Sequence, residues 1–118
     1  MGIRRVNLSS TTNGRWISVP NIYPSITGSI VHTVSASARD EIWLYAINNA
    51  TASRDLHWRA SNEPFGSELF YGTVQIRPNV GPLQILEGML MTSGTLRVMM
   101  ASGSDDINVG GWVNRITY

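Results

Sequence analysis

The chain has 118 residues, of which 42% are hydrophobic and 14% charged, which is enough for one domain with its own hydrophobic core. Its net charge of +1 excludes the strong positive field that nucleic-acid or membrane capture by charge requires. The absence of cysteine excludes disulfides and thiolate chemistry.

No apolar run approaches the roughly 20 residues that span a bilayer. The beginning, MGIRRVNLSSTTNG, lacks the apolar segment of a signal peptide, so we expect synthesis and folding in a cytoplasm. All nine basic residues are arginine, a residue that favours interfaces, although genomic base composition explains this bias equally well.

Residues 1–12 differ from the rest of the chain. They include the short basic stretch IRRVN, and no closed turn follows it on which it could fold back. Two interpretations remain open: an N-terminal arm that packs on a neighbour, or the first edge strand of the domain.

From residue 13 onward, short runs typical of strands alternate with Gly, Pro, Asn and Ser clusters. Helical periodicity is almost absent. The predicted strands are residues 15–19, 29–34, 41–47, 55–60, 71–77, 83–87, 95–101 and 105–118. The pattern predicts a single all-β domain over 13–118, an antiparallel, jelly-roll-like sandwich of about eight strands.

Two of these strands are apolar at consecutive positions. EIWLYAI (41–47) is a nearly continuous apolar run, which is typical of a strand covered on both faces. Met99 and Met100 are adjacent and must point to opposite faces. We therefore expect residues 95–101 to be covered on two sides, with subunit contact as one candidate cover.

The last strand contains the pair Gly110–Gly111. Ile107 and Val109 share a face, and strict alternation would leave Trp112 on the other one. One extra residue at the glycines would move Trp112 onto the Ile107 face. We therefore predict a β-bulge at Gly110 and Gly111, with Trp112 buried.

No residue set predicts a catalytic, cofactor or metal site. Asp105 and Asp106 are adjacent in a turn, where neighbouring carboxylates diverge, and they lack the spaced oxygen ligands of a calcium site. His32 and His57 lie within strands and are best interpreted as satisfied or exposed side chains.

The tryptophans offer a different possibility. Trp16, Trp58 and Arg59 would suit a sugar-stacking platform, because exposed rings beside polar groups bind glycans. Burial in a core or an interface is the competing interpretation for both rings.

Four segments together resemble small β-sandwich structural proteins of tailed bacteriophages. They are SIVHTVSA (29–36), DEIWLYAINNATA (40–52), GTVQIRPNVGPLQILEG (72–88) and TLRVMMASGSDDINVGGWVNRIT (95–117). The resemblance covers residues 29–118 and consists of strand and turn patterns.

This resemblance implies a non-enzymatic virion protein without cofactor, a capsid decoration (cement) protein that binds the major capsid protein as a homo-oligomer, with a trimer expected. The low net charge separately predicts no nucleic-acid or membrane partner. On the basis of the resemblance we expect Ile3, Arg4, Arg5 and Val6 to contact the capsid. The alternative is a receptor- or glycan-binding module, or an adaptor, of a phage tail or fibre.

Overall fold

The computed structural model describes residues 2–11, 14–21, 29–34, 38–62, 67–100 and 106–117. The described residues form nine strands. In chain order they are β1 (Gly2–Asn7), β2 (Ile17–Ser18), β3 (Ser29–Thr33), β4 (Arg39–Asn48), β5 (Arg54–Asn62), β6 (Ser67–Ile76), β7 (Leu83–Met91), β8 (Thr95–Met100) and β9 (Ile107–Thr117).

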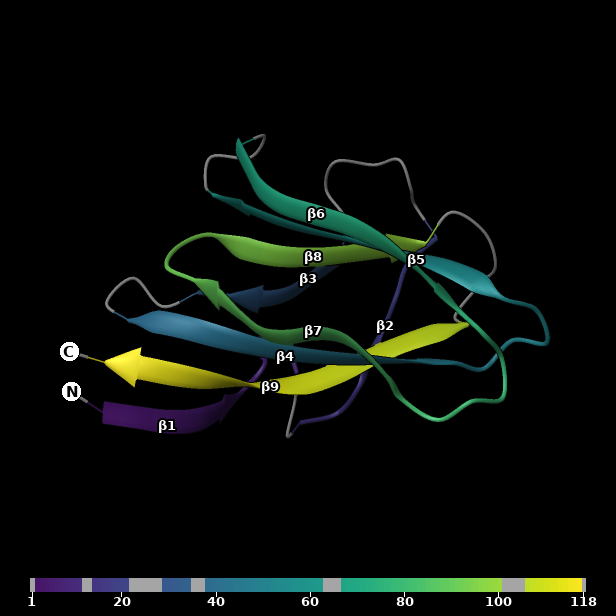
Figure 1. Ribbon diagram of the computed structural model, residues 1–118, viewed down its shortest axis with the longest axis horizontal. Coiled ribbons are helices and arrows are strands. Elements are labelled where there is room, and N and C mark those ends of the chain that lie inside the picture. Colours follow the sequence, from purple (N-terminus) through teal and green to yellow (C-terminus); the bar gives the residue numbers. More distant parts are fainter. Residues whose placement is uncertain are drawn as a thin grey trace.

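The strands build two antiparallel layers (Figure 1). Sheet A has the order β1-β9-β4-β7, with the short β2 also paired to β9, and sheet B has the order β3-β8-β5-β6. The pairs are nested: β1 with β9, β3 with β8, β4 with β7 and β5 with β6. This is the winding of a jelly roll. The predicted all-β sandwich is confirmed.

β4 illustrates why these residues form strands around a core. Its even-numbered positions from 40 to 48 are all buried, and its odd-numbered positions are more exposed. This two-residue period places Ile42, Leu44 and Ala46 between the sheets and Trp43 and Tyr45 on the outer surface of sheet A. The apolar run is therefore half-buried, rather than buried, on its outer side.

The hydrophobic core lies between the two layers. Its fully buried members include Val31, Ile42, Leu44, Leu56, Ile76, Leu96, Val98, Met100, Ile107, Val109 and Val113. Met99 and Met100 are both buried, in agreement with the prediction of a strand covered on two sides. That burial occurs within a single chain, so no neighbouring subunit is needed to cover either side chain.

The N-terminal residues belong to this domain. β1 forms the edge of sheet A, with Gly2 opposite Thr117 and Asn7 opposite Trp112. Leu8 follows, 1% exposed and part of the core cluster. Burying a leucine contributes about 2 kcal/mol, so the segment is anchored on its own chain. Of the two interpretations left open, the edge strand describes these residues.

The predicted bulge at Gly110 and Gly111 is wrong. The β4–β9 ladder keeps one register from Arg39 opposite Ile116 to Asn48 opposite Ile107. Val113 therefore shares the inner face with Val109, and Trp112 lies on the outer face opposite Trp43.

The two glycines meet steric demands instead. A Cβ on Gly110 would lie 2.5 Å from the ring of Trp16. Gly111 has φ +151° and brings the strand against the Trp43 carbonyl oxygen, where a Cβ would clash. The pair thus accommodates a ring and a close backbone contact without an inserted residue.

Register shifts occur in β7 instead. Ile42 pairs with Met89 and Trp43 with Glu87, so Gly88 is an extra residue, and its φ of +70° is one that glycine tolerates. A second shift follows between Leu44 and Tyr45. β7 therefore extends to Met91, beyond the predicted 83–87, and only three residues, 92–94, separate it from β8.

Side-chain contacts close the end of the sandwich where β9 begins. The buried Asn48 amide donates to the carbonyl oxygens of Ala52 (2.9 Å) and Ile76 (2.8 Å). Arg54 forms an ion pair with Asp106 at 2.9 Å. Asp106 is thus a structural turn residue, and Asp105 lies outside the described residues.

Candidate functional site: the outer face of sheet A

Three aromatic rings form a stack on the outer surface of sheet A. Trp43 and Trp112 are cross-strand partners, with ring centroids 5.9 Å apart and planes 9° from parallel. Tyr45 stacks on Trp112 at 5.5 Å, and the Arg5 guanidinium lies 4.7 Å from the centre of a Trp112 ring. Such contacts contribute about 1 kcal/mol each, so the stack holds its own geometry.

Polar side chains fix the stack further. The Glu41 carboxylate accepts hydrogen bonds from Trp43 Nε1 (2.9 Å) and Asn114 Nδ2 (3.0 Å), and these bonds hold its pKa below the usual value. Gln84 Nε2 donates to the Tyr45 hydroxyl at 3.2 Å. The rings are therefore pre-organised before any partner arrives.

Large apolar side chains surround the stack. Trp16 covers Gly110 and is 43% exposed, Ile3 is 67% exposed and Leu90 is 45% exposed. Cross-strand pairing places Ile3 beside Ile116 and Leu90 beside Glu41 on the same surface. We call this surface the aromatic face: Ile3, Arg5, Trp16, Glu41, Trp43, Tyr45, Leu90, Trp112, Asn114 and Ile116.

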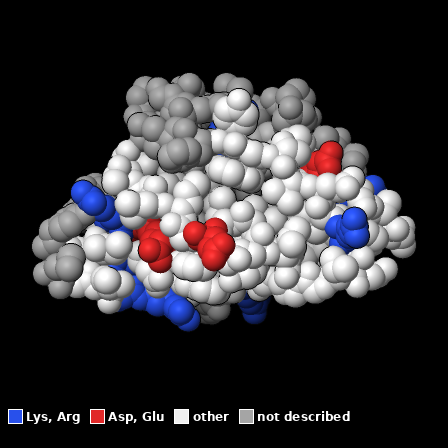
Figure 2. Space-filling view, viewed as in Figure 1, with Lys and Arg blue, Asp and Glu red and all other residues white. Residues whose placement is uncertain are grey.

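Charge is sparse on the side of the molecule seen in Figure 2. Most of that surface is uncharged, with acidic side chains near its middle and at the upper right, and basic ones at the left and lower left, where β1 lies, and at the right. A surface of this composition binds through apolar contact and a few placed charges rather than through long-range attraction.

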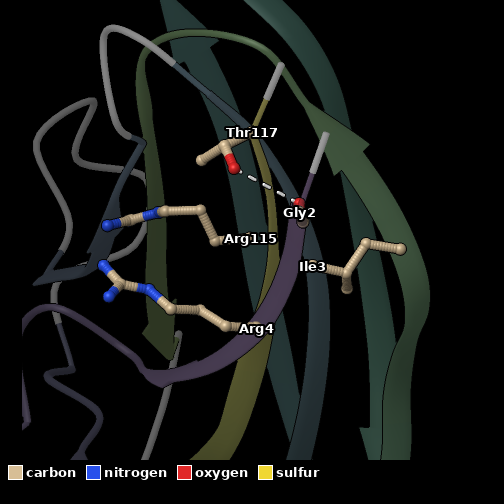
Figure 3. Close-up of a pocket in the computed structure, with 5 residues that line it drawn as sticks. All are labelled: Gly2, Ile3, Arg4, Arg115 and Thr117. Atoms are coloured by element: carbon tan, nitrogen blue, oxygen red, sulfur yellow. Dashed lines mark hydrogen bonds between the residues drawn. The ribbon is translucent and has the colours of Figure 1, made fainter.

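A pocket of about 370 Å³ opens where the β1–β9 ladder ends, lined by Gly2, Ile3, Arg4, Arg115 and Thr117 (Figure 3). Arg4 and Arg115 are cross-strand partners. Their guanidinium groups extend to the same side, whereas Ile3 points away toward the aromatic face.

Behind this pocket lies a buried polar network. Arg115 donates two hydrogen bonds to Asp40, at 2.9 and 3.0 Å, and Asp40 is 2.7 Å from His32 Nε2. His32 Nδ1 accepts from the Ser9 backbone N–H at 3.0 Å, so Nε2 carries the proton and donates to Asp40.

This network is structural. Burial lowers the pKa of His32, although the hydrogen bond to Asp40 opposes the effect, so the ring is neutral at pH 7. Burial alone would raise the pKa of Asp40, but hydrogen bonds from Arg115 and His32 outweigh it and keep the carboxyl ionised. Both imidazole nitrogens are engaged in hydrogen bonds within the network, Nδ1 with the Ser9 backbone N–H and Nε2 with Asp40.

The residues predicted to contact a capsid fall in three places. Ile3 and Arg5 lie on the aromatic face, Arg4 lines the pocket, and Val6 packs against the core opposite Val113. Ile3, Arg4 and Arg5 are exposed, whereas Val6 is partly buried.

The structure does not bring the predicted glycan platform together. Trp16 lies on the outer side of sheet A, whereas Trp58 belongs to sheet B and packs against the core over Gly72. Trp58 and Arg59 do share a smaller pocket of about 190 Å³ with His57, Tyr71 and Thr73.

Sequence reasoning missed the outer pairing of Trp43 with Trp112. The signal was the two-residue period counted from Ile107, which places Trp112 outward once no bulge is assumed at Gly110 and Gly111. Which residues lie beside Trp112 on the neighbouring strands depends on the order of strands in the sheet, and the alternation within one strand does not predict that order.

Within the described residues, no group of three His, Asp or Glu side chains could hold a metal ion. No helix in that part of the chain is long and apolar enough to cross a membrane. Comparison with protein-family models, curated proteins and solved structures finds no match for this chain.

Proposed function

We propose that this chain is a non-enzymatic structural protein of a tailed-phage virion, a decoration protein that docks on the major capsid protein through the aromatic face. The observation that carries the proposal is that face itself: stacked, pre-organised rings flanked by Ile3, Trp16 and Leu90, which are all more than one third exposed. Exposed apolar patches mark interaction sites, and tryptophan, tyrosine and arginine dominate binding energy at interfaces.

The fold and the sequence pattern support the same assignment by analogy. Jelly rolls recur in viral capsid proteins and in lectins, and residues 29–118 resemble phage β-sandwich proteins. These arguments narrow the class of protein, and the aromatic face supplies the surface by which such a protein would bind.

The edges of sheet A are poor docking surfaces. β7 is interrupted by two register shifts, and β1 carries adjacent arginines at positions 4 and 5. Bulges and edge charges are the usual means by which sheets avoid strand-to-strand association. Docking through the face is therefore favoured over strand addition.

The mechanism would be thermodynamic. A protein that binds the assembled shell, and not its separated subunits, stabilises the shell by mass action. A homo-oligomer, with a trimer expected, would strengthen the effect because its copies bind together.

A second candidate function is glycan or receptor binding on sheet B. It is favoured by the pocket that joins Trp58 and Arg59 to His57 and Thr73, with Tyr71 74% exposed at its side. An exposed ring beside hydrogen-bonding groups suits a sugar. It ranks second because Trp58 itself is packed on the core.

The assignment is tested on particles of the virus that encodes the chain. Heads assembled without this protein should lose their DNA at lower temperature than complete heads, and adding purified protein should restore the difference. Heads that survive heating equally well with and without it would overturn the decoration role. Hits on a glycan array, together with no binding to heads, would favour the second candidate.

A further inference from the structure

The pocket between Arg4 and Arg115 shares Ile3 with the aromatic face, but its two arginines extend to the side away from Ile3, and its charges do not cancel. Asp40 neutralises Arg115 through two hydrogen bonds, and His32 behind it is neutral. Arg4 is exposed and makes no ion pair or hydrogen bond within the described part of the chain. The group formed by Arg4, Arg115 and Asp40 therefore carries one excess positive charge.

The two arginines are unfavourable neighbours, and the ion pair of Arg115 with Asp40 offsets only part of their repulsion. They are directly opposite each other on β1 and β9, an arrangement in which like charges repel. A bound anion would relieve this repulsion by accepting hydrogen bonds from both guanidinium groups.

One wall of the pocket is rigid. Two bonds to a fully buried carboxylate fix Arg115, and the Asp40 hydrogen bond raises the pKa of Arg115 further above its ordinary value. An arginine has five N–H donors, and only two of them are used by Asp40. Asp40 leaves the other donors of Arg115 unused, and Arg4 is exposed on the neighbouring strand.

The backbone leaves room at the base of the pocket. Thr117 Oγ1 donates to the Gly2 carbonyl oxygen at 3.4 Å, which joins the two strand ends (Figure 3). A Cβ on Gly2 would lie only 3.3 Å from that hydroxyl oxygen. The volume of about 370 Å³ accommodates one side chain but not an extended polymer.

We propose that this pocket binds the side-chain carboxylate of an aspartate or glutamate from a partner protein. Guanidinium groups match the planar, two-oxygen geometry of a carboxylate, and two of them can hold it from both sides. Two arginines at one end of the sheet are too few for nucleic-acid binding at physiological salt.

The experiment is an NMR titration of the intact protein with capped glutamate, Ac-Glu-NHMe, at low salt. We expect saturable shifts of the Gly2 and Thr117 amides and the Arg115 Nε signal, with a dissociation constant on the order of 1 mM. The uncharged Ac-Gln-NHMe should leave these signals unchanged.

Two variants complete the test. Arg4→Ala removes an exposed side chain and should weaken binding about fivefold or more. Arg77→Ala makes the same charge change just after β6, at the end of the sandwich opposite the pocket, and should keep binding within about twofold. Equal losses in both variants, no saturable shift, or inorganic phosphate saturating these signals at lower concentration than the carboxylate would overturn the assignment.

Discussion

At Gly111, the close approach of β9 to β4 leaves no room for a side chain. The Gly111 backbone has φ +151° and lies against the Trp43 carbonyl oxygen, so alanine would have to strain or separate β4 and β9. We expect Gly111→Ala to lower the free energy of unfolding by about 3 kcal/mol.

Gly81→Ala is the matched control. A Cβ there meets no atom within 4 Å, and we expect a change within about 0.5 kcal/mol. Urea denaturation of the two variants checks this, and equal midpoints would contradict the close approach of β9 to β4.

The lowered pKa of His32 predicts how the stability of the fold depends on pH. Its pKa in the folded protein is below the ordinary value of 6.5 because the ring is buried, so the unfolded chain binds the proton more tightly. The contribution of His32 to the free energy of unfolding is fully present when the pH is above the ordinary pKa of 6.5. It is lost as the pH falls from that pKa to the lower pKa of the folded protein. Asp40, whose pKa is lowered from 3.8, adds a second loss at more acidic pH.

Unfolding free energies measured between about pH 7 and about pH 5 should therefore fall on acidification. His32→Gln should flatten this slope. His57→Gln should flatten it less, because that ring is only half-buried, although burial lowers its pKa too. A wild-type slope that survives in His32→Gln would show that another group controls it.

The sequence predicted the mid-strand placement of both histidines but not the network of His32. Asp40 and Arg115 are 75 residues apart, and nothing local connects them. Their meeting depends on β9 pairing with β4, a long-range choice of partner strand. The same reason explains why the aromatic stack was missed.

At the scale of elements, β1 pairs with β9 and Leu8 after it is buried, so the N-terminal segment packs as part of the domain. Leu8 is 1% exposed, whereas Ile3 is 67% exposed. We expect Leu8→Ala to destabilise the protein by about 3 kcal/mol and Ile3→Ala to have almost no effect. Thermal unfolding of the two variants measures this. A neutral Leu8→Ala would mean that residues 2–8 are dispensable for folding, as expected of an arm.

The existence of most strands could be predicted because alternation is a local signal. β4 alternates strictly between buried and more exposed residues, and β9 does so from Ile107 to Val109. The end of β7 could not be predicted, because a glycine at position 88 is typical of a turn. In the structure, Gly88 is an extra residue within the β4–β7 ladder. The wrong bulge at Gly110 and Gly111 has the same origin: glycine marks backbone irregularity or close contact, and the pattern alone does not tell which.

At the scale of the whole molecule, the nested pairing places the strand ends Gly2 and Thr117 side by side and exposes the outer surface of sheet A. The pattern of strands predicted the class of architecture. It could not supply the sheet order, which determines that Arg5, Trp112, Trp43 and Tyr45 share one surface.

Docking through the aromatic face is tested by measuring how variants of this protein bind to heads assembled without it. The double variant Ile3→Ser with Leu90→Arg changes two exposed side chains of that face, and Tyr71→Arg changes an equally accessible one on sheet B. Urea midpoints equal to wild type would first establish that both variants fold. In a sedimentation assay, the double variant should bind about tenfold more weakly and Tyr71→Arg within about twofold of wild type. Undiminished binding by the double variant would contradict docking through the aromatic face, and loss of binding by Tyr71→Arg would favour docking through sheet B.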